Sequence, residues 1–506
     1  MIRSNNFFTP DDAQPTSISD PSVDNTLEKI MDEIHPVDFH LLATPNREKI
    51  IESLMKEIQE GQGDETSEVT YEDALAMLND DKSITMNQQT YKVLFILELL
   101  KLSGEIGLPI ADFASETRVY CGTHWLSIQN DQLLNFLIKA GEKMGVPRFI
   151  ALDADFGKKC MKQLQATGFQ KKIHSVGTKV NFLNGTLHIK PNGEYVLTDS
   201  NPDDMITYVL PYNYDPNATC EIFDTYLNRV LPDQEKRTVL AEFIASCFTN
   251  HKHEKVLILY GTGANGKSVL LEVVTALFGT ENIGSHTLES LTDKSGYYRG
   301  QLGDCLLNYS GEISTHLNAD EFKKLASREK ISARFPYGRP FTIENYARLA
   351  FNCNELPEAE DTSEGFFRRF LIIEFDQYIR EEERDRELHK KIINSDLAGV
   401  MNWVLAGLQR LTQQGRFSPC ASADRLLEKY RREADTLLSF TESDKFDELP
   451  NEIKASDLHA TYITFCERFG YTEVGVKTFY QKIQRCGLIK KRKADGSYYL
   501  KGANAT

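Results

Sequence analysis

The chain has 506 residues and a formal net charge of −16, with 41% hydrophobic and 26% charged residues. The length predicts more than one domain, the composition is typical of a soluble globular protein, and the lack of a membrane-length apolar run excludes a membrane-spanning class. Nine cysteines occur singly, without a Cys-x-x-Cys pair or a leader of signal-peptide type. This pattern indicates a reducing cytoplasm and not a disulfide framework or a zinc site.

The charge is unevenly distributed along the chain. Residues 1–70 hold fifteen acidic residues against five basic ones, whereas the residues from Tyr471 onward hold eight basic against two acidic. A nucleic-acid partner is therefore not excluded, because a local basic face matters more than the total charge. We expect residues 1–68 to form an acidic, largely disordered tail with one short helix around residues 46–60.

Residues 69–205 are expected to form an N-terminal helical domain. Apolar residues recur at helical spacing from Tyr91 to Leu102 and from Leu133 to Met144, with a hairpin-like segment at 119–125 between them. Two short strands joined by a turn at Asn184-Gly185 follow. Residues 206–250 read as a helical lead-in or oligomerisation segment.

A phosphate-binding loop is predicted next. An apolar run of strand length, Val256–Tyr260, leads into Gly261-Thr262-Gly263-Ala264-Asn265-Gly266-Lys267-Ser268, and helix-period residues follow. Strand, Gly-x4-Gly-Lys-Ser loop and helix are the parts of a Walker A motif, in which backbone N–H groups surround phosphate oxygens. Lys267 would reach the β- and γ-phosphates, and the Ser268 hydroxyl would hold magnesium, so ATP and Mg²⁺ are the expected cofactors.

Three further motifs indicate the class of P-loop protein. The strand pattern at 305–312 ends in Glu312, which can orient the attacking water, and the strand pattern at 348–354 ends in Asn354, which can bond the γ-phosphate or that water. The adjacent pair Arg368 and Arg369 precedes an apolar strand. Either arginine suits a finger that acts on the nucleotide of a neighbouring subunit.

The order and close spacing of these motifs resemble those of the superfamily 3 helicases. The residues of the motifs are most similar to the phage and plasmid primase-helicase branch, which includes poxvirus relatives. Segments 120–125 and 181–187 are similar to signatures of that branch's N-terminal domain. The resemblance implies an α/β fold whose motor, residues 251–385, is of AAA+ type. It further implies a hexameric ring that translocates on one DNA strand and unwinds duplex during replication of a mobile genome, in a bacterial or phage-infected cytoplasm.

Two positions depart from the pattern of that family. Gly311 stands where many P-loop motors have an aspartate that holds magnesium through water. Arg328 stands where relatives often have glycine. The sequence therefore does not specify the full set of magnesium ligands or the backbone geometry around residue 328.

Nucleic-acid contacts are expected first in the basic and aromatic segment 330–341. The family places a channel hairpin in this interval, and Lys330, Arg334, Tyr337 and Arg339 would follow a strand by charge and stacking. A purely structural hairpin is the alternative interpretation.

The C-terminal residues supply a second candidate surface. After a helical lid or linker at 386–440, residues 441–506 predict a winged helix-turn-helix, with a capped helix at 456–469, a recognition helix at 476–486 and a hairpin turning at Asp495-Gly496. Its expected DNA contacts are Lys477, Lys482, Lys490, Lys491, Arg492 and Lys493. A protein-binding winged helix is the alternative.

The sequence also allows functional interpretations other than an ATP-driven helicase. Asp153 and Asp155, in a strand-like alternation at 151–155, could be primase carboxylates but lack a histidine partner, so we expect a separate primase. An ATPase switch in a regulatory or defence assembly is the alternative from another class, and it does not need a channel hairpin. A scaffold without turnover is expected to lack Glu312 or the Arg pair.

Overall fold

The computed structural model forms two compact units. The first comprises Met1–Val176, Leu183–Leu187 and Leu197–Val209, and the second comprises Gly177–Phe182, His188–Val196 and Leu210–Thr506. The structure describes residues 22–43, 86–113, 116–170, 178–190, 194–311, 317–334, 340–357, 361, 363–494 and 496–501. Within these ranges no helix combines the length and apolar character needed to cross a membrane.

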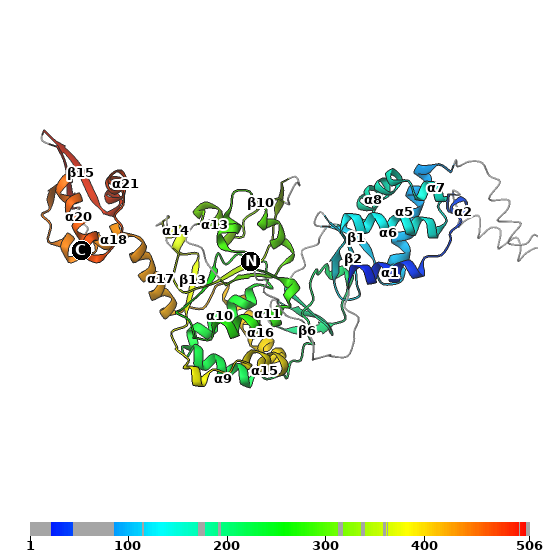
Figure 1. Ribbon diagram of the computed structural model, residues 1–506, viewed down its shortest axis with the longest axis horizontal. Coiled ribbons are helices and arrows are strands. Elements are labelled where there is room, and N and C mark those ends of the chain that lie inside the picture. The colour runs from blue at the N-terminus through cyan, green and yellow to red at the C-terminus, as the bar shows by residue number, and fades with distance from the viewer. Residues whose placement is uncertain are drawn as a thin grey trace, which may run out of the picture. The chain divides into compact units, whose positions relative to one another are not determined.

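Helices form the core of the first unit. They are α1 (Val23–Glu33), α2 (Phe39–Ala43), α5 (Gln88–Glu105), α6 (Asn130–Met144), α7 (Arg148–Ala151) and α8 (Ala154–Thr167). Figure 1 shows α5, α6 and α8 side by side. Phe95, Leu99, Leu137 and Leu164 are buried between them, so the helical spacing in the sequence corresponds to the buried faces of real helices.

The prediction of a disordered tail over residues 1–68 is wrong for α1 and α2. Leu27 and Ile30 of α1 are buried in the helical core, and Ser22 caps the helix by accepting a hydrogen bond from the Asn25 N–H. The acidic residues of this segment lie on the other face, so its average composition hides an amphipathic helix. The helix expected at 46–60 lies outside the described residues.

Two small sheets are formed by strands between residues 110 and 198. Strands β1 (Ile110–Phe113), β2 (Glu116–Tyr120) and β3 (Trp125–Ser127) pair antiparallel in that order, which confirms the expected hairpin. Strands β4 (Thr178–Phe182), β5 (Gly185–Ile189) and β6 (Tyr195–Thr198) form the other sheet. The turn lies at residues 183–184, one residue earlier than predicted, because Gly185 with φ 133° already begins β5.

A parallel sheet organises the second unit, as the sequence predicted. Its strands are β7 (Val256–Tyr260), β8 (Ile283–Gly284), β9 (Leu307–Ser310), β12 (Arg348–Cys353) and β13 (Phe370–Glu374), in the order β13-β7-β12-β9-β8. Every neighbouring pair is parallel. The chain runs from β7 to the edge strand β8, returns through β9 and β12, and passes β7 to reach β13. The connections after β7 and β12 therefore leave in opposite directions, and ligands of such sheets bind at the carboxyl ends of the strands at this point.

Helices and short elements surround this sheet (Figure 1). The helices are α9 (Glu221–Val230), α10 (Gln234–Ser246), α11 (Lys267–Phe278), α12 (Leu288–Thr292), α13 (Ala319–Ala326), α14 (Glu364–Phe367), α15 (Leu388–Ser395), α16 (Leu397–Gln414) and α17 (Ala421–Ala434). Strands β10 (Ile331–Ala333) and β11 (Phe341–Ile343) form a separate antiparallel pair. Short 3-10 helices of this unit lie at Thr280–Asn282, Tyr298–Asp304 and Glu381–Glu383, and the first unit has one at Pro202–Asp204.

Helices α10 and α16 pack with their backbones in close contact at Gly407. A Cβ atom at this position would lie 2.7 Å from the carbonyl carbon of Ala241. We therefore expect Gly407→Ala to force the helices apart and to destabilise the second unit by about 1–3 kcal/mol. Thermal unfolding followed by circular dichroism would show an earlier transition. Gly104→Ala is the matched control, because a Cβ on this α5 glycine meets no atom within 4 Å and removing a helical glycine favours folding.

The C-terminal residues form a small core of their own. Its elements are α18 (Thr436–Thr441), α19 (Asp444–Asp447), β14 (Glu452–Lys454), α20 (Ala455–Phe469), α21 (Val476–Lys482), a 3-10 turn (Ile483–Cys486), β15 (Leu488–Lys493) and β16 (Gly496–Lys501). Phe440, Tyr462, Phe479 and Tyr499 are buried together. The predicted cap of α20 is wrong, since the helix begins at Ala455 and the Ser456 hydroxyl bonds Asp457.

Candidate functional site

The loop between β7 and α11 has a backbone that requires glycine. Gly261, Gly263 and Gly266 have φ values of 150°, 48° and 90°. A Cβ at position 261 would lie 2.5 Å from the Phe375 carbonyl oxygen, and one at position 266 would lie 2.6 Å from a Val230 methyl group. The two outer glycines of the Gly-x4-Gly-Lys-Ser pattern are therefore fixed by close packing as well as by φ.

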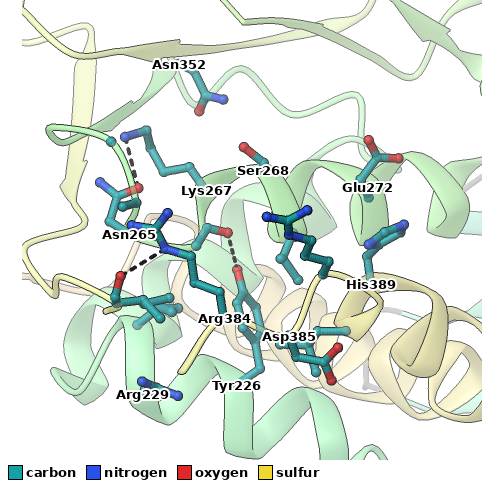
Figure 2. Close-up of a pocket in the computed structure, with 18 of the residues that line it drawn as sticks. Tyr226, Arg229, Asn265, Lys267, Ser268, Glu272, Asn352, Arg384, Asp385 and His389 are labelled. Carbon is teal, nitrogen blue, oxygen red and sulfur yellow. Dashed lines mark hydrogen bonds between the residues drawn. The ribbon is translucent and has the colours of Figure 1, made fainter. Parts of the chain in front are cut away.

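Lys267, the first residue of α11, is a buried cation with neutral partners. Its side chain is 7% exposed, and its Nζ donates to the Gly261 carbonyl oxygen and, at 3.2 Å, to Asn265 Oδ1 (Figure 2). Burial lowers the pKa of Lys267 below its usual value. The Asn265 amide in turn donates to the Phe375 carbonyl oxygen at 3.1 Å. A phosphate group fits next to the Lys267 ammonium, because the Gly261 and Asn265 oxygens that bond the ammonium are neutral and a phosphate would supply the negative charge.

The loop borders a cavity of about 1470 Å³ that lies within the second unit. Ser268 is exposed and lines the cavity, together with Asn354, which follows the last residue of β12. Gly311, one residue beyond β9, lines it too. Glu312 lies outside the described residues. The predicted loop and the ends of β9 and β12 thus meet at one site.

Asn352 is a site residue that the sequence analysis missed. It lines the cavity near Lys267 (Figure 2), and the Tyr309 hydroxyl donates to its Oδ1 at 2.6 Å. Alternate residues of a strand point to the same face, so Asn352 and Asn354 would share a face if β12 continued. The period of the strand was the signal that could have identified Asn352.

The segment after β13 forms another wall that was not predicted. Ile379, Glu383, Arg384, Arg386 and His389 all line the cavity. The Ile379 N–H donates to the Ala264 carbonyl oxygen of the phosphate loop at 2.8 Å, and Figure 2 shows Arg384 bonded to the Ile379 carbonyl. The segment is therefore attached directly to the loop.

Helix α9 completes the cavity on the side of the loop. The Tyr226 hydroxyl donates to the Gly266 carbonyl oxygen at 2.9 Å (Figure 2). Arg229 of α9 forms an ion pair with Glu383, which joins the helix to the segment after β13. Apolar side chains of Ile222, Val230 and Leu388 also face the cavity, so its lining offers both charged and apolar surfaces.

The two arginines of the predicted finger have different surroundings. Arg369 is buried, its Nε and Nη2 donate to Ser327 Oγ at 3.1 and 2.9 Å, and its Nη1 donates to the Gly365 carbonyl oxygen. The Arg368 side chain is 57% exposed and pairs with Glu254 at 2.9 Å. A finger role for Arg369 would require breaking its internal bonds, so this geometry favours Arg368.

The base of the predicted channel hairpin is the described pair β10 and β11. Lys330 bridges to Glu344 at 2.6 Å, and the Arg334 guanidinium lies 5.3 Å from the ring centre of Tyr297. Tyr337 and Arg339 lie outside the described residues. The two described cations therefore already contact other side chains of the chain.

Arg328 has an unusual backbone that explains why a glycine would suit its position. Its φ is 50°, a conformation that glycine adopts at little cost. The guanidinium donates to the carbonyl oxygens of Thr249 and Tyr346 at 2.9 and 2.7 Å. These bonds offset the strain, so the departure from glycine fits the fold.

The carboxylates considered for priming have a structural role. Residues 151–155 are not a strand, because α7 ends at Ala151 and α8 begins at Ala154. Asp153 caps α8 by accepting a hydrogen bond from the Asp155 N–H at 3.0 Å. This interaction gives the Asp153 carboxylate a capping role, and the Asp155 carboxylate lies 3.9 Å from the Lys158 ammonium.

The predicted C-terminal cations lie on two elements. Lys490, Lys491, Arg492 and Lys493 are exposed along β15. Lys477 is exposed on α21, and Lys482 is half-buried at the end of that helix. Together these side chains give the C-terminal core its local excess of positive charge.

Three family descriptions match separate parts of the chain. "D5 N terminal like" matches residues 119–232, "Family of unknown function (DUF5906)" matches residues 259–369, and "Poxvirus D5 protein-like" matches residues 432–505. The first and last confirm the resemblance to the phage and poxvirus type of superfamily 3 helicase-primase.

A protein of Acanthamoeba polyphaga mimivirus, named "Putative helicase L207/L206", is 24% identical over 253 residues. The match covers 46% of this chain and 25% of that protein, so the chain corresponds to about a quarter of its length.

Solved structures of the C-terminal region of NrS-1 are also similar. One apo structure, of its A form, has 12% identity and a TM-score of 0.49, covering 80% of this chain and 99% of that chain. A second apo structure has 13% identity and a TM-score of 0.49, covering 81% and 99%.

Proposed function

We propose that the protein is an ATP-driven DNA helicase of superfamily 3 with an AAA+ type motor. The observation that carries this proposal is the buried Lys267 ammonium, which bonds neutral partners among the described residues and borders a cavity at the carboxyl ends of parallel strands. A triphosphate would supply the missing negative charge. Ser268, exposed at the same wall, would hold magnesium, which neutralises phosphate charge when bound.

Hydrolysis would use polar groups from the ends of neighbouring strands. Lys267 stabilises the charge on the transferred phosphoryl group, and Asn354 binds that group or the attacking water. Glu312, one residue beyond the cavity-lining Gly311, orients the water. Asn352, held by the Tyr309 hydroxyl, positions the polar end of β12.

The proposed active form is a closed ring of subunits, with six as the family expectation. The exposed Arg368 would reach the nucleotide of a neighbouring subunit, which requires heterologous contacts that close by rotation. The pair β10 and β11 would carry the channel hairpin that follows one DNA strand. The C-terminal core would act as a winged helix-turn-helix that binds duplex DNA through α21 and β15. A separate protein would supply the primase.

An ATPase switch in a regulatory or defence assembly remains the second candidate, because the same cavity would serve it. ATP hydrolysis measured with and without single-stranded DNA separates the two. A helicase is stimulated by the strand and unwinds a forked duplex. A hydrolysis rate that does not change when single-stranded DNA is added, together with no unwinding of the forked duplex, would favour the ATPase switch.

Glu312→Gln is expected to separate ATP binding from hydrolysis. The amide keeps the size of the side chain but loses the charge that polarises water, so turnover should fall by about 100-fold or more while ATP binding persists. Nucleotide affinity by equilibrium dialysis and steady-state phosphate release would measure the two effects. Turnover equal to that of the unmodified protein would remove Glu312 from the catalytic role.

A further inference from the structure

The register of the C-terminal sheet divides its cations between two faces. Tyr499 of β16 is fully buried and stacks on Tyr480 of α21 with ring centres 6.0 Å apart. Lys490 lies directly opposite Tyr499 on β15, and Arg492 is two residues further along. Because directly opposed residues share a face and alternate residues return to it, Lys490 and Arg492 lie on the face that the helices cover.

The intervening residues of β15 lie on the opposite face, which we call the outer face. Lys491 is directly opposite Tyr498, and Lys454 of β14 is also opposite Tyr498 from the other side. By the same alternation the outer face carries Glu452, Lys454, Ile489, Lys491, Lys493, Tyr498 and Leu500. Three lysines against one glutamate leave this face with a positive excess.

The side chains of the outer face surround one aromatic ring. The Lys493 ammonium lies 4.5 Å from the ring centre of Tyr498 and 2.7 Å from the Glu452 carboxylate. The stem of Lys454 passes Gly496, where a Cβ would lie 3.5 Å from its Cε. Ile489 is 62% exposed between the cations. The outer face therefore presents one exposed aliphatic side chain and a half-buried aromatic ring among three lysines.

We propose that the outer face binds single-stranded nucleic acid, with a base stacked on Tyr498 and the phosphates near Lys454, Lys491 and Lys493. Unpaired bases can stack on an aromatic side chain, whereas a duplex keeps its bases stacked inside. The strand's negative charge complements the lysines. This site refines the DNA contact proposed above, because it assigns Lys491 and Lys493 of β15 to a single strand and leaves Lys490, Arg492 and α21 for duplex DNA. It needs no ATP turnover.

Two double variants of the full chain test the proposal with matched charge. Lys491→Gln with Lys493→Gln removes two cations from the outer face, and Lys490→Gln with Arg492→Gln removes two from the other face of the same strand. Fluorescence anisotropy without ATP, over a series of salt concentrations, would give the affinity for an oligo-dT strand and for a blunt duplex. Thermal unfolding of each variant checks that the core is intact.

We expect the outer variant to bind oligo-dT about 10-fold more weakly, with a salt slope smaller by roughly one because about 0.7 counterion is released per phosphate contact. Its duplex affinity should change little. The variant with Lys490→Gln and Arg492→Gln should instead bind the duplex more weakly and keep its affinity for oligo-dT. An equal loss in both variants would overturn the division by face. An unchanged oligo-dT affinity, with cross-links from the outer face to acidic residues 1–70, would assign the face to that segment and also overturn the proposal.

Tyr498 supplies a test that does not depend on charge. Tyr498→Leu should weaken oligo-dT binding by about 5- to 100-fold, whereas Tyr498→Phe keeps the stacking ring and the affinity. Ultraviolet cross-linking of a 5-iodouracil strand should label the peptide that contains Tyr498. Labelling confined to other peptides, or equal affinities for the Leu and Phe variants, would refute the stacking site. All these readouts are taken without nucleotide, so a failed motor assignment would leave them unchanged.

Discussion

Lys267→Ala is expected to lower ATP hydrolysis by roughly 1,000-fold. The transition state would lose its principal side-chain cation from a site where burial strengthens electrostatic interactions. Phosphate release under saturating ATP is the direct measurement. Binding of ATP should weaken as well, since the same ammonium meets the ground-state phosphates.

The folded state gives this variant a clean interpretation. Within the described part of the chain the Lys267 ammonium bonds the Gly261 carbonyl and the Asn265 side chain, which are both neutral, so its removal leaves neither of these two groups as an unpaired charge. We expect the thermal unfolding of the Ala variant to match that of the parent protein. Retention of more than a tenth of the parent turnover would contradict the assignment of the loop as the site of hydrolysis.

Arg368→Ala is the second change with a large expected effect. In the proposed ring its guanidinium acts on a neighbour's nucleotide, and an arginine finger contributes about 10³-fold or more to turnover. Stability should change little, because its exposed ion pair with Glu254 is of a kind worth about 0–1 kcal/mol. Turnover and thermal unfolding of Arg368→Ala, measured together, test both statements.

Arg369→Ala is the matched control for the finger. It removes the buried bonds to Ser327 and Gly365, so we expect a loss of about 1–3 kcal/mol in folding free energy. Mixing Arg368→Ala with Lys267→Ala subunits should restore part of the activity, because mixed interfaces pair a sound finger with a sound loop. A monomeric and fully active protein would rule out action between subunits.

The parts of the site set by local spacing were predictable from sequence. The phosphate loop follows from a strand, a glycine pattern and a helix that are contiguous in the chain, and Asn354 follows from the end of an apolar strand. Parallel strands then bring their carboxyl ends together at one edge. Local residue patterns also predicted the strands of the parallel sheet and the helices and hairpin of the C-terminal core.

Features that depend on distant residues were not predictable. The wall formed by Ile379 to His389 reaches the cavity only because the chain returns to the loop after β13. The different environments of Arg368 and Arg369 depend on Ser327, which no local pattern connects to them. Helix α1 was missed because composition was averaged over a segment in which the apolar residues occupy one face.

Strand β13 has mechanical implications for the proposed ring. Arg369 immediately precedes it, and Phe375, which immediately follows it, accepts a hydrogen bond from Asn265 of the phosphate loop. All five residues of β13 pair with β7 in the parallel sheet, and the strand spans roughly 16 Å. In the proposed ring, the Arg369 end would lie next to the arginine that contacts the neighbour's nucleotide. The Phe375 end contacts the loop that would bind the subunit's own nucleotide. If Arg368 contacts the neighbour's nucleotide, β13 therefore links that contact to the phosphate loop of its own subunit.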